Sequence, residues 1–340
     1  MVSLSRQVNI AKQVVFLDGL TGTGKTMLAP ILSTFCRVEV QRLEHIYEHI
    51  CALRYLDRIE EDAAIEMVQI YLDLACYNAM IGRESNFRWK DLSGVLSNPG
   101  GWRYVWRLFQ PDGEPVIERI NQSQPIVQIV SHQVLGISET LFSALGERLT
   151  VIEAVRHPLH LLQHWYSYID RHGTDPRDFT VWISHNGVNL PWFAAGWEER
   201  YLACNKMDRV IFTIDRLTHL ADQAYKDLTI TDARRVLLIP FERFVVEPSV
   251  YLKQIADLLN TTTTKSTHRA LTKQKVPRSL STDGLDLQIY RRYDWRPPDK
   301  GNTEASELRH RWEYAASEAS EEGLDVLQKM CSAYEVRYLN

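Results

Sequence analysis

The chain of 340 residues and 39.4 kDa is long enough to bury a sizeable core, in one large domain or two small ones. Apolar residues make up 45% of it and charged residues 24%, which is typical of globular proteins and excludes disordered and collagen-like chains. The formal net charge of −4 argues against a protein that binds nucleic acid over its whole surface.

Cysteine usage and hydropathy bear on the cellular compartment. The five cysteines are scattered and form no CxxC pair, so neither a zinc ribbon nor a disulfide scaffold is indicated. No apolar run approaches the roughly 20 residues needed to cross a bilayer, and the N-terminus lacks the apolar segment of a signal peptide. We therefore expect a cytoplasmic protein without a membrane span.

Short apolar runs rich in β-branched residues recur along the chain, as in strands that are buried on both faces of a parallel sheet. They are VVFLDG from Val14, IVQIVSH from Ile126, LTVIEAVR from Leu149, RVIFTID from Arg209 and RRVLLIPFERF from Arg234. Longer stretches with helical spacing lie between them, so the pattern predicts an α/β three-layer fold with a central, mainly parallel sheet. We assign this domain to residues 1–290.

Two regions depart from this alternation. Residues 82–125 contain the breakers NPGG and PDGEP and are expected to form an irregular insertion, which either shapes the substrate pocket or is a surface excursion. Within it, the aromatic residues Trp102, Tyr104 and Trp106 alternate along the chain. This alternation has two interpretations: the three residues line an acceptor pocket, or they belong to one strand packed on the core. Residues 291–340 begin with the loop WRPPDKGN and are expected to continue as a helical hairpin packed on the domain.

The strongest motif is GLTGTGKT at residues 19–26, which matches GxxxxGK[ST] between a predicted strand and a helix that starts near Lys25. Glycines let successive backbone N–H groups point at phosphate oxygens, and both the helix N-terminus and Lys25 add positive charge. We predict a phosphate-binding loop, whose contacts come from Gly22, Thr23, Gly24, Lys25, Thr26 and Met27.

The loop alone does not identify the phosphate compound. ATP-using loops usually work with an acidic residue at the end of a neighbouring strand, which holds magnesium. Asp18 is too close to the loop for this role, and Glu153 and Asp215 do not follow their strand-like runs in the expected form. This pattern favours a donor other than ATP.

Two further strand ends carry candidate site residues. The run IVQIVSH ends at Ser131 and His132, and a histidine at the carboxyl end of a parallel strand projects into the ligand crevice, where it can act as a general base. The run LTVIEAVR ends at Arg156, before His157 and Pro158, and such an arginine can pair with a second phosphate in bidentate fashion.

In this order, the elements of residues 14–260 resemble the P-loop sulfotransferases, which use 3′-phosphoadenosine 5′-phosphosulfate (PAPS). That family has a phosphate loop, a strand ending in Thr-His, a strand ending in Arg-Asn/His-Pro, a Trp-rich stretch and a Tyr-Glu-Asp-Leu-like strand end before Asp-Pro. The matching segments are residues 19–26, 131–132 and 156–158, PWFAAGWEERYL, and LIPFERF followed by Glu247 and Pro248.

The resemblance implies a sulfotransferase that moves a sulfuryl group from PAPS to a hydroxyl or amine of a small molecule or glycan. It implies that His132 is the general base, that the loop with Lys25 holds the 5′-phosphosulfate and stabilises the leaving phosphate, and that Arg156 holds the 3′-phosphate. No metal is required by this chemistry.

The sequence departs from the family pattern at three positions. The basic residue that normally lies two residues before Gly24 is replaced by Gly22, so Lys25 supplies the charge from another angle. The serine eight residues beyond the arginine is replaced by His164, which can still donate to phosphate. The late Arg-Lys-Gly loop is absent as such, and Arg278 is the candidate in its place.

Two other functions remain open from the sequence. One is an ATP- and Mg²⁺-dependent kinase of a small molecule, in which Thr26 would coordinate the ion. The other is a non-catalytic nucleotide-binding regulator. The sequence specifies neither the acceptor nor the oligomeric state, for which a homodimer is only the commonest outcome.

The clustered histidines do not predict a metal site. His157, His160 and His164 form HxxHxxxH, but there is no HExxH motif and no clear third ligand. His45 and His49 repeat the i, i+4 spacing among acidic residues, which an exposed helix face explains.

Overall fold

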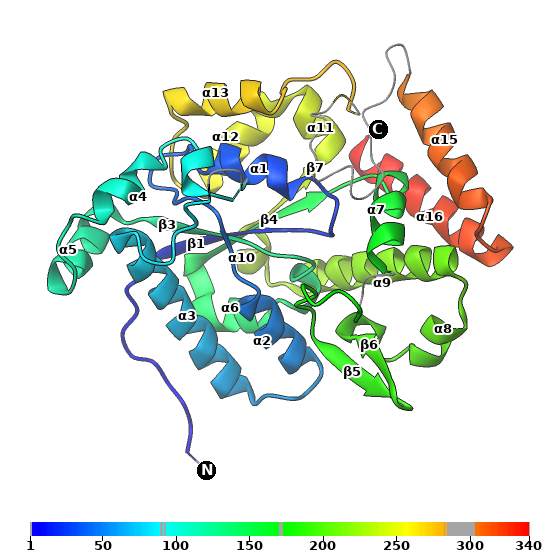
Figure 1. Ribbon diagram of the computed structural model, residues 1–340, viewed down its shortest axis with the longest axis horizontal. Helices are drawn as coiled ribbons and strands as arrows, with labels where there is room; N and C mark the ends of the chain where they lie inside the picture. Colours follow the sequence, from blue (N-terminus) through cyan, green and yellow to red (C-terminus); the bar gives the residue numbers. More distant parts are fainter. Residues whose placement is uncertain are drawn as a thin grey trace.

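A computed structural model describes residues 2–88, 91, 93–169, 173–281, 283 and 303–339. Their main feature is a five-stranded sheet, in the order β2-β3-β1-β4-β7, in which every pairing is parallel (Figure 1). The strands are β1 (Gln13–Asp18), β2 (Arg42–Leu43), β3 (Ile126–Val130), β4 (Leu149–Val155) and β7 (Val236–Pro240). The predicted α/β fold with a mainly parallel sheet is confirmed.

Helices cover both faces of the sheet (Figure 1). On one face, a core cluster joins the sheet to α1 (Lys25–Leu32), α11 (Phe241–Val246), α12 (Pro248–Leu258) and α13 (Lys265–Lys273). On the other, a larger cluster includes α2 (Ile46–Tyr55), α3 (Glu61–Ile81), α6 (Glu139–Leu145), α7 (Leu159–Ile169) and α9 (Lys206–Asp227). The remaining elements of this part are the antiparallel hairpin of β5 (Trp182–His185) and β6 (Val188–Pro191) and the short helices α8 (Glu198–Ala203) and α10 (Ile230–Ala233).

The strand register brings the predicted site residues to one edge. Leu17 pairs with Val130, Asp18 with Glu153, and Val155 with Pro240, so β1, β3, β4 and β7 end at nearly the same level. Because the strands are parallel, the segments that follow them meet at this carboxyl edge.

One predicted strand is wrong, because RVIFTID from Arg209 lies inside the 22-residue helix α9. The Asn205 side chain caps this helix by accepting a hydrogen bond from the Asp208 N–H. Its buried apolar residues recur at helical spacing, namely Val210, Ile211, Ile214 and Leu217. A run of seven residues is compatible with a strand or with a helix. The long amphipathic stretch that follows it favours the helix.

Residues 82–125 are more regular than expected. They include η1 (Val95–Ser97), α4 (Trp102–Arg107) and α5 (Glu114–Ser123). The alternating aromatics therefore lie on a helix and not on a strand: Trp102 and Trp106 are 73% and 68% exposed, whereas Tyr104 is buried. The Tyr104 hydroxyl donates to Glu39 and accepts from the Val40 N–H, so this side chain anchors α4 to the body.

The chain ends in two helices, α15 (Glu304–Ala316) and α16 (Glu321–Tyr338). Helix α16 packs along α9, and the Tyr334 hydroxyl donates to Glu242 in α11, directly after β7. The expected boundary at residues 290–291 and the WRPPDKGN loop lie outside the described residues. Among the described helices, none combines the length and the apolar composition that a membrane span requires.

Candidate functional site

The phosphate loop connects β1 to α1, which begins at Lys25 as predicted. Gly19 and Gly24 have φ angles of 132° and 97°, which L side chains rarely adopt. A Cβ on Gly19 would lie 2.3 Å from the Ala154 carbonyl oxygen, and one on Gly24 would lie 2.4 Å from the Phe241 ring. Both glycines are therefore required by backbone conformation and by space.

Lys25 lies inside the loop and not in solvent. It is only 5% exposed, and its Nζ donates to the carbonyl oxygens of Gly19 at 2.5 Å and Leu20 at 2.9 Å. Burial lowers the pKa of Lys25, and the nearby carboxylates of Asp18 and Glu153 oppose that shift. The Lys25 side chain is thus held against the carbonyl oxygens of the loop itself.

The two acids below the loop, Asp18 and Glu153, are both buried. Asp18 accepts hydrogen bonds from the Ser131 hydroxyl at 3.0 Å and from the Leu135 N–H at 2.6 Å. Burial and the neighbouring Asp18 carboxylate raise the pKa of Glu153 well above its ordinary value, which favours the protonated acid. The residue that follows β3 is Ser131, so this strand end does not supply the acid that an ATP-using loop needs.

Three residues from separate segments meet beside the loop. The guanidinium carbon of Arg156 lies 4.3 Å from the centre of the Phe241 ring, and that of Arg278 lies 5.4 Å from it. Arg156 Nη1 also donates to the Gly22 carbonyl at 2.8 Å, and Arg278 Nη2 lies 3.5 Å from the Met27 sulfur. The structure therefore brings both predicted arginines to the loop. Phe241, whose ring both guanidinium groups approach, was not predicted as a site residue.

Helix α7 contacts the loop through two of its side chains, Trp165 and His164. The Trp165 indole N–H donates to the Thr21 carbonyl at 3.0 Å, and half-buried His164 lies beside Gly22, 3.6 Å from a Cβ built there. The Thr23 hydroxyl donates to the Leu20 carbonyl, which closes the turn, whereas Thr26 is exposed. All residues predicted from the loop motif thus lie in one short segment, and Trp165 is an additional anchor.

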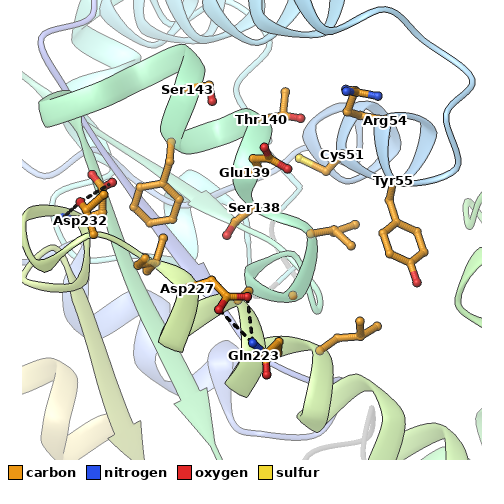
Figure 2. Close-up of a pocket in the computed structure, with 17 residues that line it drawn as sticks. Cys51, Arg54, Tyr55, Ser138, Glu139, Thr140, Ser143, Gln223, Asp227 and Asp232 are labelled. Carbon is orange, nitrogen blue, oxygen red and sulfur yellow. Dashed lines mark hydrogen bonds between the residues drawn. The ribbon is translucent and has the colours of Figure 1, made fainter.

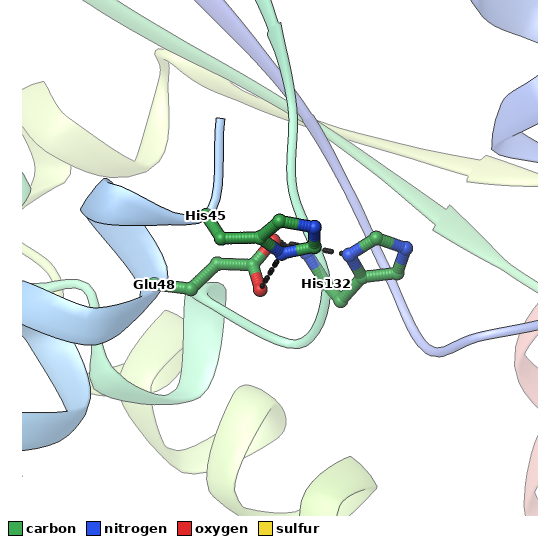
Figure 3. A group of neighbouring side chains, drawn as sticks. All are labelled: His45, Glu48 and His132. Atoms are coloured by element: carbon green, nitrogen blue, oxygen red, sulfur yellow. Dashed lines mark hydrogen bonds and ion pairs between the residues drawn. The ribbon is translucent and has the colours of Figure 1, made fainter. Parts of the chain in front are cut away.

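The predicted base, His132, pairs with an acid that the sequence did not single out. Glu48 Oε1 lies 3.0 Å from both the backbone nitrogen and the ring Nδ1 of His132. His45 Nδ1 lies 3.2 Å from the other carboxylate oxygen (Figure 3). The two histidines lower the pKa of Glu48 to about 2 against the opposing effect of burial, so this carboxylate is ionised.

The prediction that His45 lies on an exposed helix face does not describe its surroundings in the structure. Its ring is stacked 6.1 Å from that of His132 and 6.2 Å from that of His49, and it is half-buried. The i, i+3 spacing of His45 and Glu48 across the first turn of α2 was the available signal. It could not reveal His132, which is 84 residues from Glu48 in the chain.

The HxxHxxxH residues do not form a metal site among the described residues. His157 Nε2 lies 3.3 Å from Glu335, and its ring packs on Tyr334. Burial lowers the pKa of His160 well below its ordinary value, as in an uncharged core histidine. In the described parts of the chain, the group with metal-ligand spacing is His45, Glu48 and His132.

Two cavities adjoin these elements. One of about 770 Å³ lies between α2, α6 and the end of α9, and its lining includes Cys51, Arg54, Ser138 and Gln223 (Figure 2). Another of about 400 Å³ lies below the loop, between Thr23, Arg156 and residues of α9 and α16. Neither is lined by residues 82–125, so in these two cavities that region does not have the pocket-shaping role considered from the sequence.

The fold and the loop together define a P-loop α/β protein. The chain is similar to solved structures that are all sulfotransferases, at low identity. The sulfotransferase domain from the curacin biosynthetic pathway has a TM-score of 0.45 and 11% identity, and the match covers 96% of this chain and 98% of that one. The sulfotransferase domain from the Synechococcus PCC 7002 olefin synthase has a TM-score of 0.39 and 14% identity, over 93% and 98%.

A sulfotransferase from Mycobacterium tuberculosis H37Rv has a TM-score of 0.38 and 13% identity, over 83% of this chain and 76% of that one. No family model and no curated protein matches the sequence.

Proposed function

We propose that this protein is a PAPS-dependent sulfotransferase that acts on a hydroxyl or amine of a small molecule or glycan. The observation that carries the proposal is the placement of Arg156 and Arg278 on the Phe241 ring, directly beside the phosphate loop. Two guanidinium groups and an aromatic face next to a phosphate cradle fit a nucleotide with a second phosphate better than one with a single polyphosphate chain.

Each part of the donor has residues suited to hold it. The backbone N–H groups at the start of α1 and the Lys25 ammonium would hold the 5′-phosphosulfate. Arg156 and Arg278 would hold the 3′-phosphate, with His164 as a further donor from α7. Bound PAPS would supply the sulfuryl group, and the loop amides and Lys25 would stabilise the charge that grows on the departing 5′-phosphate.

The contact between His132 and Glu48 supports a role for His132 as general base. Ionised Glu48 can only accept hydrogen bonds, so in the neutral form of the His132 ring the proton lies on Nδ1 and the lone pair on Nε2. In the proposed reaction, Nε2 takes the proton of the acceptor group as its oxygen or nitrogen bonds to sulfur and the bond from sulfur to the 5′-phosphate oxygen breaks. Glu48 is a positioning residue, because it fixes the tautomer and orientation of the ring.

A kinase has weaker support from the same geometry. Both oxygens of Asp18 are engaged by Ser131 and Leu135, and Glu153 favours its protonated form, in which it is a poor magnesium ligand. The kinase and the regulator remain the alternatives against which the proposal is tested.

An activity assay separates these functions. Purified protein is incubated with radiolabelled PAPS and a panel of hydroxyl and amine acceptors, and in parallel with γ-labelled ATP, Mg²⁺ and the same panel. The proposal predicts transfer from PAPS only, without added Mg²⁺, and its loss in His132→Ala. Transfer from ATP would support the kinase, and transfer from neither compound, despite nucleotide binding, would support the regulator.

A further inference from the structure

The group formed by His45, Glu48 and His132 has the composition of a metal site. His45 is the N-cap residue of α2, Glu48 lies in the first turn of this helix, and His132 follows β3 (Figure 3). One ligand atom from each, two imidazole nitrogens and a carboxylate oxygen, lie within 4.8 Å of one another. Glu48 Oε1 and Oε2 are 3.0 Å and 3.2 Å from the Nδ1 atoms of His132 and His45.

These spacings fit a small divalent ion. Zinc binds imidazole nitrogen and carboxylate oxygen at about 2.0–2.2 Å, so ligand atoms around a tetrahedral ion are about 3.4 Å apart. Each of the two nitrogen–oxygen distances, one to each oxygen of Glu48, is close to this value. Two histidines and one carboxylate leave a fourth position for water.

The site is also reachable and has suitable charge. The side chains of His45, Glu48 and His132 are 30%, 18% and 27% exposed, so an ion can enter from solvent. The Glu48 carboxylate, whose two oxygens face the Nδ1 atoms of both histidines, supplies negative charge for a cation. We propose that His45, Glu48 and His132 bind a divalent transition-metal ion such as Zn²⁺, and that the bound ion prevents His132 from acting as a base.

The inhibitory part follows from the chemistry of imidazole and rests on the proposed function. A metal bound to Nδ1 leaves the proton of the neutral ring on Nε2. That is the atom that must accept a proton in the transfer reaction. The metal-bound form and the base-active form of His132 therefore exclude each other, and Glu48 serves both, as metal ligand or as hydrogen-bond acceptor.

Binding is tested first, without any assay of activity. The metal-stripped full-length protein is titrated with Zn²⁺ by calorimetry and with Co²⁺ by visible absorption, in a Cys36→Ser background that removes the exposed thiol. His45→Gln removes one ligand. His49→Gln is the matched control, because its ring stacks on His45 but its Nε2 lies 2.5 Å from the Phe179 carbonyl, outside the group.

We expect one ion per chain, an unchanged affinity in His49→Gln, and binding at least about tenfold weaker in His45→Gln, since even partners that only orient ligands typically account for 10–100-fold. If the protein binds no ion, or if both variants bind alike, the metal site is overturned.

Inhibition is then measured as the ratio of rates with and without Zn²⁺ for each protein. The inhibitory role predicts a large ratio for the parent and His49→Gln and a ratio near one for His45→Gln at the same Zn²⁺ concentration. Equal ratios in all three would refute it. Metal binding without any sulfuryl transfer would leave the site standing and contradict the proposed function instead.

Discussion

A single carboxylate oxygen of Glu48 lies 3.0 Å from both the backbone nitrogen and the ring Nδ1 of His132. The first contact fixes the segment after β3, and the second fixes the ring that the segment carries. Helix α2 thereby contacts both the backbone and the ring of a residue at the carboxyl edge of the sheet.

This relationship predicts the effect of Glu48→Ala. Without the carboxylate, His132 samples both tautomers and several ring orientations, and kcat should fall by about 10²-fold, within the 10²–10⁴ range of general-base catalysis. The affinity for 3′-phosphoadenosine 5′-phosphate (PAP) should not change. Glu44→Gln alters an acid on the adjacent segment, which pairs with Arg42, and serves as control. Equal loss of kcat in both variants would contradict a specific role for Glu48.

His132→Ala should separate catalysis from binding. Removing the base should reduce sulfuryl transfer by roughly 10²–10⁴-fold, while PAP binding measured by calorimetry stays within error of the parent. His219→Ala, on the exposed surface of α9, is the control. A His132→Ala protein that transfers at the parental rate would show that another group takes the proton.

Gly24→Ala should disrupt the loop. Its Cβ would lie 2.4 Å from Phe241, and the residue would have to keep a φ of 97°. Gly113→Ala is the matched control, since Gly113 has a φ of 74° but a Cβ there meets no atom within 4 Å. We expect Gly24→Ala to lose PAP binding, with a larger fall in melting temperature than the control. Similar behaviour of the two variants would show that contact with Phe241 does not shape the loop.

The buried acid Glu153 should make stability depend on pH. Burial and Asp18 raise its pKa in the folded state above the ordinary value of 4.5, so the folded protein binds this proton more tightly than the unfolded chain. Its contribution to stability is therefore complete below the unfolded pKa and is lost as pH rises through the folded pKa.

Glu153→Gln keeps a hydrogen-bond donor near Asp18 but cannot ionise. We expect the free energy of unfolding of Glu153→Gln, from urea titrations, to increase relative to that of the parent as pH is raised from about 5 to about 9. Curves that stay parallel over this range would show that folding does not raise the pKa of Glu153.

The sequence predicted the parts of the site that depend on local pattern. The glycine loop and the strand ends at His132 and Arg156 are each encoded within a few residues, and parallel strands bring such ends together. The prediction of a strand from Arg209 was wrong because a short apolar run does not distinguish a buried strand from a buried helix.

Contacts between distant segments could not be predicted in this way. Glu48 and His132 are 84 residues apart, and Phe241 approaches Arg156 and Gly24 only because β7 pairs with β4. Nothing in the residues around Glu48 or Phe241 specifies these partners, since the approach depends on the strand order of the sheet.

The most direct test of the central claim is calorimetric titration with PAP, ADP and ATP plus Mg²⁺, on the parent, Arg156→Ala and Arg177→Ala. Arg177 is 68% exposed, pairs with Asp175 and serves as control. Loss of one charge-assisted phosphate contact should cost roughly 1.5–3 kcal/mol, or about 10- to 150-fold in affinity. We predict that PAP binds more tightly than ADP and that Arg156→Ala removes the difference. Tighter binding of ATP with Mg²⁺ than of PAP, unaffected by Arg156→Ala, would contradict the account.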